Sequence, residues 1–253
     1  MDINAPCISS TIDEHGPIYV YQTRTSLILS FDGEIYQGYM KLNNVNGLAL
    51  DYTQAMMTGL LFVPLAKTAT IMGLGAGSMA KNLLSSFSDL KVHAVEYRDE
   101  VVKVAKKYFH LPETDRLVIH IDEAAHYLKR TTVKSDIIFS DLYNSEGMEP
   151  TQVQSSYLRD CKNALNQHGV LVLNICHTAL KSQDEVDGLL ALEFKNRLLS
   201  FEIEGGNTVM LAFKNEIPVV TREELLAKAK CLQGKMNIEL EPYAQRFCDA
   251  QSL

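Results

Sequence analysis

Three glycines stand at alternate positions in the stretch Ile71–Met79, which reads IMGLGAGSM. Gly73, Gly75 and Gly77 come directly after a short apolar run, and the segment from Ser78 onwards has a helical pattern. Glycine permits positive φ and close ligand approach, and the free N–H groups of a helix N-terminus attract oxygen atoms. We therefore expect this turn to receive a ligand with a carboxylate, phosphate or ribose oxygen. The dinucleotide pattern G-x-G-x-x-G requires a glycine at position 78, but this residue is Ser78. Because the match to that pattern is incomplete, a purely structural tight turn is the alternative.

Three carboxylates follow apolar stretches downstream of the glycines. Glu96 ends the run VHAVE, Asp122 follows RLVIHI, and Asp141 ends SDIIFSD. In a doubly wound sheet the carboxyl ends of parallel strands meet at one edge, where ligands bind. At that edge Glu96 is suited to the two hydroxyls of a ribose, Asp122 to the amine of adenine, and Asp141 to accepting a proton. The pattern predicts an adenosine-type nucleoside site, with a solvated strand end for Glu96 and a loop-anchoring role for Asp141 as the alternatives.

Alternating strand and helix patterns position these residues. Apolar runs typical of strands buried on both faces alternate with amphipathic stretches typical of helices, and a glycine-rich turn predicts a closing antiparallel hairpin. Right-handed crossovers between such units give a doubly wound α/β sheet of seven strands. The expected strands are 68–74, 91–97, 116–121, 135–143, 169–176, 201–206 and 207–214, and the expected helices are 78–87, 98–109, 123–130, 154–165, extending to near Gly169, and 184–196.

The two ends of the chain have different patterns. Residues 17–42 are rich in β-branched and aromatic residues and predict two or three antiparallel strands. A helix is expected at about 52–63 because Pro64 follows it. In the tail, Thr221 with Glu224 predicts a capping box, and Gly234 predicts the end of that helix.

Composition excludes several classes of protein. The 253 residues carry a formal net charge of −7, which argues against a nucleic-acid partner or an anionic membrane. No apolar run approaches the roughly 18 residues of a membrane span, and the N-terminus lacks the pattern of a signal peptide. The five cysteines are scattered, and no metal-ligand spacing is present. We expect a cytoplasmic protein with reduced thiols and no metal.

Residues 17–176 resemble the spermidine synthase (polyamine aminopropyltransferase) family, and especially its divergent spermidine synthase-like branch. The matching stretches are YTQAMM, MGLGAGS, VHAVEYRDEVVKVAKKYF, VIHIDEAAHYL and IIFSDLYNSEG. The resemblance implies a Rossmann-like domain of the class I methyltransferase type in residues 67–253. It also implies a small N-terminal β-rich subdomain with a linking helix in residues 1–66. An S-adenosyl nucleoside as co-substrate, a small-molecule amine acceptor and a homodimer are further implications.

The resemblance also implies roles for individual residues. Asp141 takes the position of the catalytic acid that accepts a proton from the attacking amine. From their own chemistry, and not from the resemblance, Tyr143 and Asn144 are suited to orient a planar or polar acceptor, with a plain loop role as the alternative. The remaining residues would bind the nucleoside. Gly73, Gly75 and Gly77 would line its methionine-derived part, and Glu96 would bind the ribose hydroxyls. Asp122 and Glu123 would lie by the adenine, and Gln54 and Gln22 would lie at the nucleoside and amine site.

Three positions depart from the family pattern. Ala76 replaces an aspartate of the glycine loop, Asn144 replaces the second acid after the fourth strand, and Thr53 replaces a tyrosine. Each change removes a group that holds a cationic amine. Without the acid at position 76, discrimination against the carboxylate of intact S-adenosylmethionine is lost, so we expect that nucleoside to bind at least as well as its decarboxylated form.

Three functions therefore remain open from the sequence. The first is transfer of an aminopropyl group from decarboxylated S-adenosylmethionine to a polyamine-type amine. The second is methyl transfer from S-adenosylmethionine to an unidentified small molecule. The third is nucleoside binding without turnover.

Overall fold

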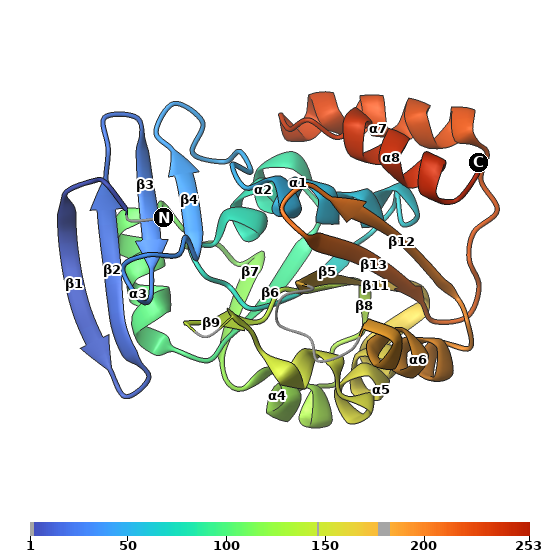
Figure 1. The fold of residues 1–253 in the computed structure, drawn as a ribbon, viewed down its shortest axis with the longest axis horizontal. Coiled ribbons are helices and arrows are strands. Elements are labelled where there is room, and N and C mark those ends of the chain that lie inside the picture. Colours follow the sequence, from blue (N-terminus) through green and yellow to red (C-terminus); the bar gives the residue numbers. More distant parts are fainter. Residues whose placement is uncertain (1–2, 146, 177–182) are drawn as a thin grey trace.

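The computed structural model describes residues 3–145, 147–176 and 183–253 and contains two separate main sheets (Figure 1). The smaller sheet is antiparallel and has the order β1-β2-β3-β4. Three of its strands come from about residues 17–42, where the sequence predicted two or three, and the first strand lies before that stretch. Its strands are β1 (Cys7–Asp13), β2 (Gly16–Gln22), β3 (Ser26–Ser30) and β4 (Gly38–Lys41).

The larger sheet has seven strands in the order β12-β13-β11-β8-β5-β6-β7. Its strands are parallel except β13, which runs antiparallel to both of its neighbours. The predicted doubly wound sheet of the class I methyltransferase type is thereby confirmed. The strands are β5 (Thr68–Met72), β6 (Lys91–Glu96), β7 (Leu117–Ile121), β8 (Ser135–Ser140), β11 (Leu165–Cys176), β12 (Leu198–Ile203) and β13 (Asn207–Phe213).

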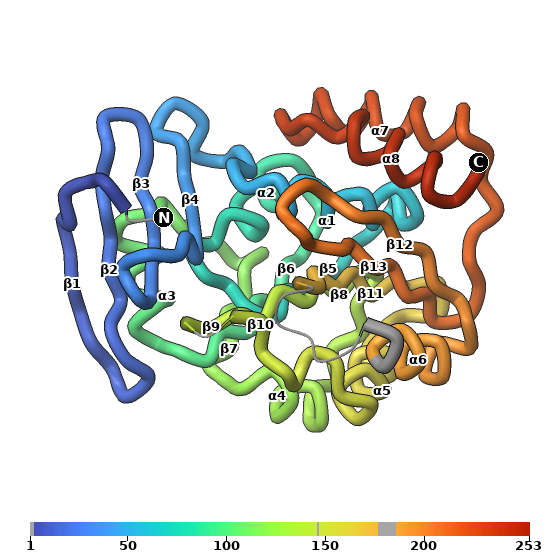
Figure 2. Tube along the Cα trace, viewed as in Figure 1, coloured from blue at the N-terminus to red at the C-terminus, as the bar shows by residue number. Residues whose placement is uncertain are grey.

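Helices cover both faces of this sheet, as Figure 2 also shows along the Cα trace. One face packs against α1 (Asp51–Met56) with the 3-10 helix Met57–Leu61, α2 (Ser78–Ser86), α7 (Arg222–Met236) and α8 (Glu241–Ala250). The opposite face packs against α4 (Ala124–Arg130), α5 (Ser155–Ala164) and α6 (Gln183–Phe194). A short hairpin, β9 (Tyr143–Asn144) and β10 (Gly147–Met148), and the 3-10 helix Pro150–Val153 connect β8 to α5.

Helix α3 (Asp99–Tyr108) joins the two sheets. Val101 and Val104 pack on the apolar side chains of the small sheet, whereas Val102 and Ala105 on the same helix belong to the main core. A helix with apolar residues on two faces is expected to lie between two packed layers. The small sheet is therefore held at the edge of the large one, beside the carboxyl ends of its strands.

Two predicted boundaries are wrong, and one predicted helix is only partly α-helical. The helix expected to extend to near Gly169 ends at Ala164, because the chain enters β11 directly at Leu165. The helix expected at 52–63 is a short α-helix continued by a 3-10 turn. Thr221 and Glu224 do form the capping box, but the helix passes Gly234 and ends at Met236, where Asn237 takes the left-handed conformation. No helix in the described part of the chain is long and apolar enough to cross a membrane.

Candidate active site

A cavity of about 730 Å³ lies at the carboxyl ends of β5, β6, β7 and β8 and extends to the small sheet. This volume is within the range of sites for nucleoside-sized ligands. The cavity is rich in aromatic and acidic side chains. Its lining includes His15, Tyr36, Gln37, Tyr39, Tyr52, Thr53, Gly73, Gly75, Ala76, Glu96, Tyr97, Arg98, Asp122, Glu123, Asp141, Tyr143, Asn144, Glu149, Asn174 and Asn207.

The glycine loop needs glycine partly because the chain packs against itself. Gly73, Gly75 and Gly77 all have positive φ, at 90°, 54° and 72°. A Cβ at Gly73 would lie 2.4 Å from the backbone oxygen of Asp141, and one at Gly77 would lie 2.6 Å from Leu111. Gly73 and Gly75 line the cavity, but Gly77 is not among the lining residues and instead precedes α2. The prediction that all three line the ligand site is therefore corrected for Gly77.

Glu96 lies at the end of β6 with 9% of its surface exposed. Its carboxylate accepts hydrogen bonds from the backbone N–H groups of Leu74 (3.1 Å), Gly75 (3.2 Å) and Arg98 (3.1 Å). Burial raises the pKa of Glu96 above its ordinary value, although these backbone donors act in the opposite direction. The acid is thus fixed directly against the glycine loop, where the sequence placed a ribose.

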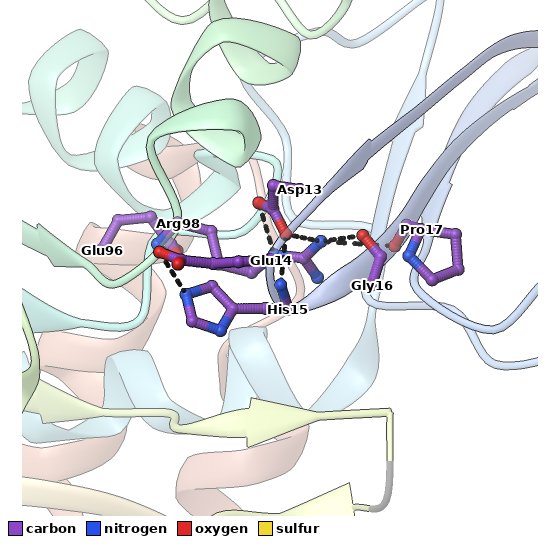
Figure 3. A network of polar contacts seen from close by, with 7 residues as sticks. All are labelled: Asp13, Glu14, His15, Gly16, Pro17, Glu96 and Arg98. Atoms are coloured by element: carbon purple, nitrogen blue, oxygen red, sulfur yellow. Dashed lines mark hydrogen bonds and ion pairs between the residues drawn. The ribbon is translucent and has the colours of Figure 1, made fainter.

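Arg98 fastens the small sheet to this end of the cavity (Figure 3). Its guanidinium donates to both carboxylate oxygens of Asp13, at 3.0 and 2.8 Å, and to the carbonyl oxygen of Gly16 at 2.7 Å. Arg98 is 8% exposed. Removing one partner of such a buried bidentate pair strongly destabilises the folded protein, because the other charge is left buried without a counter-ion. His15, in the same hairpin, lies beside Tyr97 with ring centroids 4.3 Å apart. The β1–β2 hairpin therefore forms one wall of the predicted nucleoside site.

Asp122 and Glu123 follow β7 and both line the cavity. The carboxylate of Asp122 accepts hydrogen bonds from His126 Nδ1 at 3.0 Å and from Arg130 Nη2. Burial alone would raise the pKa of Asp122, but these two partners outweigh burial and lower it. Asp122 thus stays ionised, and an adenine amine would share it with His126 and Arg130.

Asp141 follows β8 and is fixed by two side chains from distant parts of the sequence. Asn174 Nδ2 on β11 donates to Asp141 Oδ1 at 2.9 Å, and the hydroxyl of Tyr52 on α1 donates to the same carboxylate. Burial raises the pKa of Asp141 to about 6, against the effect of these hydrogen bonds. A carboxylate with such a pKa is a better proton acceptor than an ordinary aspartate and remains ionised at neutral pH.

The orientation of the Asn174 amide is set by a third residue. Asn207 Nδ2 on β13 donates to Asn174 Oδ1 at 2.7 Å, so the amide nitrogen of Asn174 must point at Asp141. Asn174 is 1% exposed. Its backbone oxygen also accepts from Tyr143, at 3.4 Å, and from Gln152, at 2.8 Å. The Asp141 carboxylate is therefore held in a fixed orientation by a buried polar network that could not be predicted from the sequence.

Tyr143 and Asn144 line the cavity, where they were predicted to face the acceptor. Burial raises the pKa of Tyr143, and the Asp141 carboxylate raises it further, so the phenol stays protonated. Asn144 donates from Nδ2 to Glu149 Oε2 at 2.9 Å, and its backbone oxygen accepts from Gln37 Nε2 at 3.1 Å. The segment after β8 is thus connected to the small sheet through Gln37.

The two predicted glutamines lie elsewhere. Gln54 is not among the residues that line the cavity, and its side-chain oxygen accepts from the backbone N–H of Glu239 at 2.8 Å. Gln22 is exposed at the end of β2 and is also absent from the lining. Nearby residues that do line the cavity include Tyr52 and Thr53, beside Gln54, and Gln37, directly before β4. The sequence contained the stretch YTQ but no signal for which of its side chains turns inward.

The fold and the cavity together define a Rossmann-like protein of the class I methyltransferase type, with an acidic nucleoside-sized site. The chain belongs to the spermine/spermidine synthase family, because the model of the spermine/spermidine synthase domain matches residues 50–187. It is a transferase.

The chain is similar to several known transferases and to solved structures of the same fold. A polyamine aminopropyltransferase of Neisseria meningitidis serogroup A is 29% identical over 214 residues, which cover 83% of the chain and 81% of that protein. The eEF1A lysine and N-terminal methyltransferase of Bos taurus is 27% identical over 207 residues, covering 74% of the chain and 29% of that protein. A solved spermidine synthase in complex with the transition-state analogue AdoDATO shares the fold, with a TM-score of 0.69 at 18% identity, covering 95% of the chain and 83% of that structure.

Proposed function

We propose that this protein transfers the aminopropyl group of decarboxylated S-adenosylmethionine to a primary amine, with Asp141 as the proton acceptor. The observation that carries the proposal is the Asp141 carboxylate, which is oriented by Asn174 and Tyr52 and has a pKa of about 6. It lies in the same cavity as Glu96 and Asp122. The solved spermidine synthase of similar fold, described with a transition-state analogue, supports this choice of nucleoside.

The reaction is a displacement at the propyl carbon bonded to sulfonium. The amine nitrogen forms a bond to this carbon, the carbon–sulfur bond breaks, and its electron pair leaves with sulfur as neutral 5′-methylthioadenosine. The nitrogen loses a proton to the Asp141 carboxylate. Because sulfonium is already a good leaving group, alignment of the two reactants and removal of the proton are the main tasks of the protein.

Charge in the lining favours cationic ligands. Arg98 is the only lysine or arginine among the described lining residues, and its guanidinium is bound to Asp13. Sulfonium and ammonium groups therefore enter a cavity whose described lining contains several carboxylates and no lysine or arginine other than the paired Arg98. A cation placed beside a desolvated carboxylate is stabilised much more than in water.

Methyl transfer is the second candidate, and it is favoured by the residue at position 76. Ala76 is 2% exposed and contacts Gly38, where an added Cβ would come within 2.5 Å of the Ala76 methyl group. Because residue 76 is alanine, the glycine loop lacks the acid that would repel the carboxylate of intact S-adenosylmethionine. The bovine methyltransferase relative is consistent with this alternative.

Product analysis by mass spectrometry tests the two functions directly. The protein is incubated with 1,4-diaminobutane and either decarboxylated or intact S-adenosylmethionine. We expect equal amounts of aminopropylated diamine and 5′-methylthioadenosine from the decarboxylated nucleoside. A methylated amine and S-adenosylhomocysteine from the intact nucleoside would instead establish methyl transfer. Tight binding of the nucleosides with neither product would rule out both transfers to this diamine.

The finer organisation is also proposed. We divide the chain into a β-rich subdomain of residues 1–66 and a nucleoside-binding domain of residues 67–253, which agrees with the two separate sheets. The family resemblance supports a homodimer in the cytoplasm, without a nucleic-acid or membrane partner.

A further inference from the structure

We propose that Glu149 is the carboxylate that recognises the far cationic end of the acceptor, and that Asn144 holds it in place. This inference rests on the proposed amine acceptor and adds the residue that selects a diamine over a monoamine. Both Glu149 and Asp141 line the same cavity. Glu149 would then supply, from a different position, the second acid that the chain lacks at residue 144.

The backbone fixes Glu149 relative to Asp141. The N–H of Glu149 donates to the carbonyl oxygen of Leu142, the residue after Asp141, at 2.9 Å. Met148, directly before Glu149, is 5% exposed and belongs to the core beneath α4, α5 and α6. The two carboxylates are therefore connected by a short, anchored hairpin, so their separation is set by the fold.

The Glu149 carboxylate has neutral partners. Its Oε2 accepts from Asn144 Nδ2 at 2.9 Å, and its Oε1 accepts from Thr151 Oγ1 at 3.3 Å. Among the described residues, no lysine, arginine or histidine side chain forms an ion pair with it. A carboxylate has about four lone-pair sites, so two neutral donors leave acceptor capacity for a ligand. A half-buried carboxylate without a counter-ion, at the wall of a ligand cavity, is suited to an ammonium group.

The small sheet closes the same end of the cavity. Gln37 Nε2 donates to the backbone oxygen of Asn144 at 3.1 Å, and Tyr36 and Tyr39 line the wall beside Gln37. Aromatic faces attract alkylammonium groups. The chemical class that fits is an α,ω-diamine: one nitrogen is presented to Asp141 as the nucleophile, and the other stays charged near Glu149.

The test is calorimetric titration of 1,4-diaminobutane and of 1-aminobutane into protein saturated with 5′-methylthioadenosine. For the unmodified protein we expect the diamine to bind about 10- to 100-fold more tightly than the monoamine, as expected for one charged hydrogen bond. Glu149→Gln keeps an oxygen for the Asn144 amide and removes the charge. We expect it to abolish the preference by weakening diamine binding alone.

Two further variants separate charge recognition from structural damage. Glu34→Gln makes the same change at an exposed residue of the small domain outside the lining, and should leave the preference unchanged. Asn144→Asp in the Glu149→Gln background returns a carboxylate to this end and should restore part of the preference. An undiminished preference in Glu149→Gln, or no preference in the unmodified protein, would overturn the inference. Diamine that binds in this way but yields no aminopropylated product would refute the proposed function and leave the recognition role of Glu149 standing.

Discussion

Replacing Asp141 with asparagine should lower kcat by about 100- to 10,000-fold, the range for loss of a positioned proton acceptor. Asparagine has nearly the same shape as aspartate, but it cannot take the proton of the attacking amine. The Glu96 end of the cavity is unchanged, so nucleoside affinity should remain close to that of the unmodified protein. Steady-state kinetics and calorimetry with 5′-methylthioadenosine measure the two quantities separately.

The pH dependence of the unmodified protein provides a second readout of Asp141. Its pKa is raised to about 6, and it acts in the ionised form. Activity should therefore be retained above this pH and should fall by about tenfold per unit below it. The control variant Asp115→Asn makes the same aspartate-to-asparagine change as Asp141→Asn, but on an exposed loop. It should leave both kcat and the pH dependence of activity unaltered. Normal turnover by Asp141→Asn would remove Asp141 from the mechanism.

Replacing Glu96 with glutamine should weaken the binding of 5′-methylthioadenosine by about 10- to 100-fold, as expected when a charged hydrogen-bond acceptor is lost. The glutamine oxygen can still accept from Leu74 and Gly75, but its NH₂ group then meets the backbone N–H of Arg98, which is also a donor. Two ribose hydroxyls would face a single remaining acceptor. Calorimetry with the nucleoside measures the effect.

Thermal unfolding without ligand is the control for Glu96→Gln. If the variant unfolds near the temperature of the unmodified protein, weaker binding reports the lost ribose contact and not a disordered glycine loop. Nucleoside affinity equal to that of the unmodified protein would contradict the ribose role of Glu96.

The placement of the acids could be predicted because it depends on a general property of parallel sheets. Glu96 ends an apolar strand, Asp122 and Asp141 each directly follow one, and the carboxyl ends of parallel strands meet at one edge. The periodicity of the sequence is sufficient to find such strands, and no long-range contact has to be known.

The partners of Asp141 could not be predicted, because they depend on contacts between distant segments. Asn174 and Asn207 are separated by 33 residues and meet only because β13 pairs antiparallel with β11. Tyr52 reaches Asp141 from α1, whereas Gln54 on the same helix turns toward the C-terminal segment and bonds Glu239. Which side chain of a short helix faces a cavity is decided by tertiary packing, and YTQ alone does not carry that information.

A crystal structure of the protein with 5′-methylthioadenosine tests the central claim most directly. We expect the ribose hydroxyls at the Glu96 carboxylate, the adenine beside Asp122, and the sulfur directed toward Asp141. A nucleoside bound outside this cavity, or a cavity that stays empty at saturating nucleoside, would contradict the account.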